Sequence, residues 1–132
     1  MKKVLTIIAL CLSFAHADLV WQNYLNSASV AAKQKKKNLF VLVESTHCRW
    51  CKMLKDTTLS DPKIKSKLGN FILVKTMRED SQKYSLPPII GVPTMLIMTP
   101  DRKIIEQGVG YLESEDLLEI IGKFNARAKS RK

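Results

Sequence analysis

Two cysteines, Cys48 and Cys51, are the residues whose type and spacing most clearly predict chemistry. They lie three residues apart, where a short apolar run gives way to a segment with helical periodicity. This spacing lets the two sulfurs close a small disulfide across one turn, with the first sulfur at a helix N-terminus. Free backbone N–H groups and the helix dipole favour an anion there, which makes a thiolate at Cys48 a better-populated nucleophile than an ordinary cysteine. The pair therefore predicts thiol–disulfide exchange.

The first 17 residues predict a secretory signal peptide. Lys2 and Lys3 precede an apolar run over residues 4–14, which is too short for a stable bilayer-spanning anchor, and alanines follow at 15 and 17. A retained N-terminal anchor is the alternative interpretation. Cleavage removes Cys11 and leaves residues 18–132 as one domain whose only cysteines form the closely spaced pair. A loop this short constrains little unfolded-chain entropy, so the pair indicates chemistry, and the protein is expected in the periplasm.

The chain is basic, with 22 Lys and Arg residues against 12 Asp and Glu residues. Removal of Lys2 and Lys3 with the signal leaves 20 against 12, a net charge of +8. We interpret this excess as a lysine-rich solvated surface and keep attraction to acidic proteins or anionic lipid head groups as the alternative. Nucleic acid is not an expected partner, because the chain is predicted to be exported and has no basic-aromatic array.

The remaining periodicities predict an α/β domain with a mixed sheet of about four strands. Helices are expected over residues 21–36, from the cysteine pair onward, from Ser60-Asp61-Pro62 to Gly69, and from Ser114, with a frayed tail over 126–132. Strands are expected over residues 39–43, 71–74, 94–98 and 103–107. The first two strands should be parallel, because helical segments separate them, and the last two should form a hairpin.

At this point the chain resembles the thioredoxin-like superfamily over residues 20–127. It is similar to small exported members built like the C-terminal domain of the transmembrane disulfide reductase. The matching motifs are Cys48-Arg49-Trp50-Cys51-Lys52 after an apolar strand, Gly91-Val92-Pro93-Thr94 at a strand start, and Gly108-Val109-Gly110-Tyr111 before the terminal helix. The resemblance implies that residues 18–132 form a thioredoxin-like three-layer α/β/α sandwich.

The resemblance also implies roles for individual residues. Cys48 would attack a disulfide of a protein substrate, and Cys51 would resolve the mixed disulfide. Pro93 would follow a cis peptide bond, and its loop would pack against the sulfurs and offer the backbone of Val92 to an extended substrate. No cofactor is implied.

Three side chains next to the cysteines are expected to shape the site. Arg49 and Trp50 replace the Gly-Pro pair of thioredoxin itself, and a cation at Arg49 or His47 would stabilise the Cys48 thiolate and favour an oxidising pair. Thioredoxin has a buried acid six residues before its first cysteine, where this chain has Leu42. Glu44 could partly substitute by strand alternation, although a solvated strand end is the preferred interpretation for it.

Several alternatives stay open at this stage. The direction of exchange is one: a reductase of protein disulfides fed by a membrane electron donor is preferred to a disulfide-donating oxidant. A copper carrier that uses the two thiolates with help from Met77, Met95 or Met98 is a different class of function. Cys48, Cys51 and His47 are too few ligands for structural zinc, and no metal site is predicted. We expect a monomer.

Overall fold

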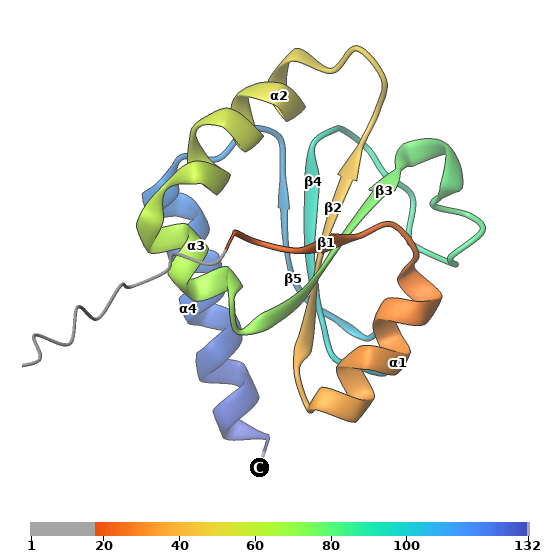
Figure 1. Ribbon diagram of the computed structural model, residues 1–132, viewed down its shortest axis with the longest axis vertical. Coiled ribbons are helices and arrows are strands. Elements are labelled where there is room, and N and C mark those ends of the chain that lie inside the picture. Colours follow the sequence, from red (N-terminus) through yellow and green to blue (C-terminus); the bar gives the residue numbers. More distant parts are fainter. Residues whose placement is uncertain (1–17, 132) are drawn as a thin grey trace, which may run out of the picture.

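The computed structural model describes residues 18–131. Its helices and strands follow the order β1 (Trp21–Gln22), α1 (Leu25–Lys35), β2 (Asn38–Glu44), α2 (Arg49–Asp56), η1 (Thr58–Ser60), α3 (Pro62–Leu68), β3 (Phe71–Met77), η2 (Arg78–Asp80), β4 (Thr94–Met98), β5 (Ile104–Val109) and α4 (Ser114–Ser130). The α/β class expected from the sequence is confirmed (Figure 1).

The strands form one mixed sheet in the order β1-β3-β2-β4-β5. Strand β3 is parallel to both β1 and β2, β4 is antiparallel to β2, and β4 and β5 form the expected hairpin. The sheet therefore has five strands, one more than the sequence indicated.

Helices cover both faces of this sheet, which confirms the three-layer arrangement (Figure 1). On β2, Phe40 and Leu42 face a core completed by α2, α3 and α4. Leu39 and Val41 face a second core completed by α1 and by residues of the loop before β4. All four side chains are fully buried, as expected for a central strand covered on both sides.

The expected helix over residues 21–36 is wrong at its start. Trp21 lies in the short edge strand β1, opposite Leu73, and its ring contacts Phe40 edge-on at a centroid distance of 6.1 Å. The helix begins only at Leu25. Trp21 and Leu25 are four positions apart, as on one face of a helix, but they face different cores. Their spacing therefore misled the prediction.

The expected start of α3 is confirmed, and α4 begins at the expected residue but has a different cap. The Asp61 carboxylate accepts a hydrogen bond from the Lys63 backbone N–H at 2.8 Å, and Pro62 takes the first helical position. Serine is a residue type that often caps helices, but the N-cap of α4 is Glu113 and Ser114 is the first helical residue. The hydrogen bond between Ser114 and Asp61 is the main cause that lowers the pKa of that carboxyl below its ordinary value.

The C-terminal part of the domain is more regular than expected. Helix α4 continues to Ser130 through the region expected to fray, because Arg127 donates to the Ile105 carbonyl and pairs with Glu106 at 2.7 Å. Gly108, which follows the strand expected over residues 103–107, is part of β5. Only the next glycine, Gly110, has positive φ, at 86°.

The strand register brings the two conspicuous motifs together. Strand β2 leads into the connection that ends at Cys48, and Val43 near its C-terminal end is opposite Thr94, the first residue of β4. The segment that contains Pro93 therefore arrives at the same end of the sheet as the cysteine pair.

Candidate active site

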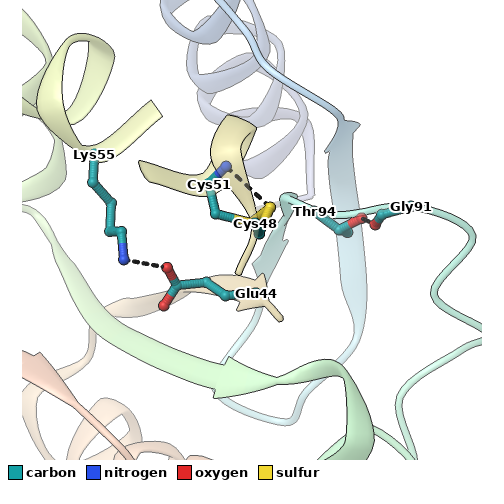
Figure 2. Close-up of a disulfide and its surroundings, with 6 residues drawn as sticks. All are labelled: Glu44, Cys48, Cys51, Lys55, Gly91 and Thr94. Carbon is teal, nitrogen blue, oxygen red and sulfur yellow. Dashed lines mark hydrogen bonds and ion pairs between the residues drawn. A yellow bond between two sulfur atoms is a disulfide. The ribbon is translucent and has the colours of Figure 1, made fainter. Parts of the chain in front are cut away.

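The candidate site is built around the N-terminus of α2. Cys48 is the N-cap residue, and a disulfide joins it to Cys51 in the first turn, with 5.2 Å between the Cα atoms. The Cys51 backbone N–H donates to the Cys48 sulfur at 3.1 Å (Figure 2). A sulfur that caps a helix in this way sits where backbone donors and the helix dipole stabilise negative charge.

The two sulfurs differ in access. Cys51 is buried, with 2% of its surface exposed, whereas Cys48 is partly exposed. An incoming disulfide can therefore reach Cys48 more readily than Cys51, which is bonded to Cys48. This difference matches the attacking and resolving roles expected for the two residues.

The loop before β4 has a fixed geometry. The peptide bond between Val92 and Pro93 is cis. The Thr94 hydroxyl donates to the Gly91 carbonyl at 2.6 Å, and this hydrogen bond spans the cis bond. The Gly110 N–H donates to the Pro93 carbonyl at 2.7 Å. Pro93 is buried and Val92 is partly exposed. The loop is thus held between β4 and the segment that follows β5.

The expected charges beside Cys48 face the solvent. His47 is exposed and has φ of 56°, and Arg49 is exposed with its guanidinium 5.7 Å from the centroid of the Trp50 ring. Solvent screens charges in such positions, so their effect on a thiolate at Cys48 is small.

Tyr111 is a neighbour of the site that the sequence did not single out for a role. Its ring lies 5.8 Å from that of Trp50, which is half exposed, and its hydroxyl is 3.1 Å from the hydroxyl of Thr57. Trp50 in α2 and the C-cap residue Thr57 are seven positions apart, so they lie on one side of the helix two turns from each other. Because Gly110 binds the Pro93 carbonyl, Tyr111 connects α2 to the cis-proline loop. The sequence feature that could have pointed to Tyr111 is its place in the Gly108-Val109-Gly110-Tyr111 motif.

Glu44 corrects an expectation, because it is not a solvated strand end. Its side chain is only 12% exposed and pairs with Lys55 at 2.6 Å between the carboxylate oxygen and Nζ. Figure 2 shows the two groups turned toward one another. Lys55 lies one turn after Cys51 on the same face of α2, so the pair lies along the face that carries the buried cysteine.

The described residues do not assemble a metal site around the cysteines. Residues 18–131 contain no cluster of three or more His, Cys, Asp or Glu side chains suited to a metal ion. Met98 is fully buried opposite Leu39, at the other end of β2 from the cysteines, and Met95 is buried in the core. Met98 therefore does not complete the copper site considered from the sequence.

The pattern of a buried strand, a CxxC helix start and a cis-proline loop has a match among protein families. A family model described as "Thioredoxin-like" matches residues 20–100. The chain belongs to the thioredoxin-like family. No curated protein matches the sequence significantly. Among residues 18–131 of this thioredoxin-like chain, we find no helix with the length and apolar character needed to cross a membrane.

Solved structures share the fold. A thioredoxin from Thermus thermophilus is 21% identical, with a TM-score of 0.67 over 82% of this chain and 88% of that one. The DsbH oxidoreductase is 16% identical, with a TM-score of 0.64 over 83% and 86%. The C-terminal domain of DsbD from Neisseria meningitidis, in its oxidised form, is 17% identical, with a TM-score of 0.56 over 71% and 86%. At these identities the likeness concerns the fold of this thioredoxin-like chain.

Proposed function

We propose that this protein is a thiol:disulfide oxidoreductase that reduces protein disulfides in the periplasm. The observation that carries the proposal is the cysteine pair itself: an accessible Cys48 caps α2, a buried Cys51 lies one turn later, and a disulfide joins them. Export rests on the predicted signal peptide over residues 1–17, which lies outside the described residues.

The reaction passes two electrons to the client. The Cys48 thiolate attacks one sulfur of a client disulfide, which forms a mixed disulfide and releases the other client sulfur as a thiolate. Cys51 then loses its proton and attacks the Cys48 sulfur. The Cys48–Cys51 disulfide forms, and the second client thiolate leaves. A membrane protein with a reactive dithiol would return the pair to the reduced state.

Apolar surface next to the site supports a polypeptide client. Trp50, Ile90 and Val109 are 50%, 80% and 41% exposed, although all three are large and apolar. A groove of about 160 Å³ lies between the loop around Pro88 and the edge of β5, with Ile90 and Val109 in its lining. An extended chain on the backbone of Val92 would place apolar side chains near this surface.

The direction toward reduction is supported by the exposure of the two nearby cations. His47 and Arg49 were the residues that favoured an oxidising pair, and both face solvent. Because these two cations stabilise the Cys48 thiolate only weakly, they give little support to an oxidising pair. We therefore keep the reductase direction, which the sequence resemblance favours. A disulfide-donating oxidant remains the second candidate, supported by the position of Cys48 at a helix N-terminus, which stabilises the reduced thiolate form.

Single-cysteine variants test the proposal. Cys48→Ser should abolish reduction of a model protein disulfide such as insulin. Cys51→Ser should instead accumulate mixed disulfides through Cys48, visible on non-reducing gels and reversed by dithiothreitol. Full activity of the Cys48→Ser variant would refute the mechanism. N-terminal sequencing of the protein recovered from the periplasm should begin at Asp18.

A further inference from the structure

The positive charge of the domain is concentrated at the end of the sheet opposite the cysteine pair. We define this basal surface by the cations of three helix C-termini and of the β4–β5 turn. They are Lys33, Lys35, Lys36 and Lys37 around the end of α1, Lys65 and Lys67 in α3, Lys103 in the turn, and Arg127, Lys129 and Arg131 at the end of α4. Arg102 in the same turn is not included, because its guanidinium donates to Asn26 in the first turn of α1 and to the Tyr84 carbonyl, away from this end.

The strand register and specific contacts place these segments at one end. Asn38 and Phe71, the first residues of the parallel strands β2 and β3, are opposite one another, and Lys37 donates to the Gly69 carbonyl at 3.3 Å. Met98, the last residue of β4, is opposite Leu39, so the turn after β4 lies at the same end. Figure 1 shows the ends of α1 and α4 on this side, away from the start of α2.

The basal surface accounts for the entire charge imbalance of the described residues. Of the 22 Lys and Arg residues, Lys2, Lys3 and Lys132 fall outside residues 18–131, which leaves 19. Ten of these are basal and nine are elsewhere. All 12 Asp and Glu residues are within 18–131; we assign three to the basal surface, Asp18, Asp101 and Glu106, which leaves nine elsewhere. The remainder of the domain is therefore neutral, with nine charges of each sign.

Most basal cations are not paired with a carboxylate of the described residues. Lys33 pairs with Asp101 at 3.6 Å and Arg127 with Glu106. The other eight have no carboxylate within 4 Å among residues 18–131. A lysine in each last turn stabilises its helix through the dipole, but four lysines within the five positions 33–37 at the end of α1 exceed that need and repel one another.

We propose that the basal surface binds an anionic phospholipid bilayer. Eight of its ten cations are lysines, which act as mobile point charges suited to a diffuse layer of phosphates, whereas recognition of carboxylates on a protein favours the planar fork of arginine.

This mode of binding orients the domain. With the basal end on the bilayer, the N-terminus of α2 and the cis-proline loop point away from it. Cys48 then stays open to clients in the surrounding space while the protein remains concentrated near a membrane partner. The proposal concerns binding alone and does not depend on the redox activity.

The test is sedimentation of the purified exported protein with two kinds of vesicles, phosphatidylcholine alone and an equal mixture with phosphatidylglycerol. Binding to the mixed vesicles is expected at low ionic strength and should weaken as salt rises. Each basal cation contributes about fivefold to partitioning, so a variant with Gln at Lys35, Lys67 and Lys129 should bind about a hundredfold more weakly. A matched variant with Gln at Lys63, Lys83 and Lys123 has the same net charge and should retain binding to within a few-fold.

Three outcomes would overturn the proposal. Equal binding to neutral vesicles would assign the interaction to apolar contacts, including any retained N-terminal segment. Equal losses in the two triple variants would assign it to net charge without a defined surface. Binding to soluble polyglutamate but not to the mixed vesicles would indicate an acidic protein as the partner. Circular dichroism and insulin reduction should be unchanged in both variants, since neither alters the cysteine site.

Discussion

Replacement of Glu44 by Gln should slow the second half of the exchange reaction and leave the first half unchanged. Cys51 is buried, and burial disfavours the thiolate that it must form to attack Cys48. Glu44 is a carboxylate only 12% exposed, four residues before Cys48, and its partner Lys55 lies one turn after Cys51. We therefore expect Glu44 to accept the proton of Cys51, directly or through water.

The size of the effect follows from the surroundings of the pair. A positioned general base contributes about a hundredfold or more when no other acceptor competes. The Lys55 side chain is 42% exposed, so water reaches this pair and can take part of the role. We therefore expect the second step to slow by about tenfold to a hundredfold at neutral pH. The loss should vanish at high pH, where the thiol ionises without help. The amide can still accept from Lys55, so the free energy of unfolding should fall by only about 1 kcal/mol.

The assay separates the two steps. Reduced protein is mixed with dithiobis-nitrobenzoate, which releases one coloured thiolate when Cys48 attacks and a second when Cys51 resolves the mixed disulfide. Asp56→Asn is the matched control, because Asp56 pairs with Lys52 on the same helix but is 57% exposed. A second phase that is unchanged in Glu44→Gln, or equally slow in Asp56→Asn, would refute the assignment of Glu44 as the acceptor.

Three further predictions concern the framework of the site. Gly108→Ala should lower the free energy of unfolding by about 1–3 kcal/mol, because the added Cβ would lie 2.7 Å from the Leu112 side chain; chemical denaturation measures this. The Asp61 carboxylate should stabilise the fold at neutral pH, and this stabilisation should be lost as the pH falls through its lowered pKa. The melting temperatures of wild type and Asp61→Ala should therefore converge in acid, and a difference that stays constant with pH would contradict the hydrogen bond from Ser114. Tyr111→Ala should cost about 1 kcal/mol and change the fluorescence of the tryptophan that it contacts, whereas Tyr111→Phe should retain most of both.

The sequence predicted the parts of the fold that have a strong local signal. The apolar runs of β2, β3 and β4 are long enough to specify buried strands, and Asp61 with Pro62 specifies a helix start by two independent preferences. The pairing of the strands followed from the helical crossovers between them. These features depend on neighbours in the chain, which is why they could be predicted.

The errors concern contacts between distant residues. Strand β1 has only two residues, and its existence depends on Leu73 of β3 and on the Trp21 contact with Phe40. The end of α4 is held by Ile105 and Glu106, which lie about 20 residues earlier in the chain. No local pattern predicts either arrangement.

In the candidate site too, the residues in contiguous motifs were predicted and the contacts between distant residues were not. Cys48, Cys51 and Pro93 were predicted because their motifs are contiguous, and the structure brings all three to one end of the sheet. Glu44 was expected in solvent because its partner Lys55 belongs to a different element. Tyr111 had no predicted role, since its contact with α2 bridges 54 positions of the chain.

The equilibrium reduction potential of the Cys48–Cys51 pair tests the proposed function most directly. Reduced and oxidised glutathione in varied ratio set the potential, and trapping of the free thiols gives the fraction of protein reduced. Our account predicts one two-electron transition in the range of thioredoxin, about −270 mV. A value near −120 mV would contradict the reductase and support a disulfide donor, and a pair that never equilibrates with glutathione would contradict exchange altogether.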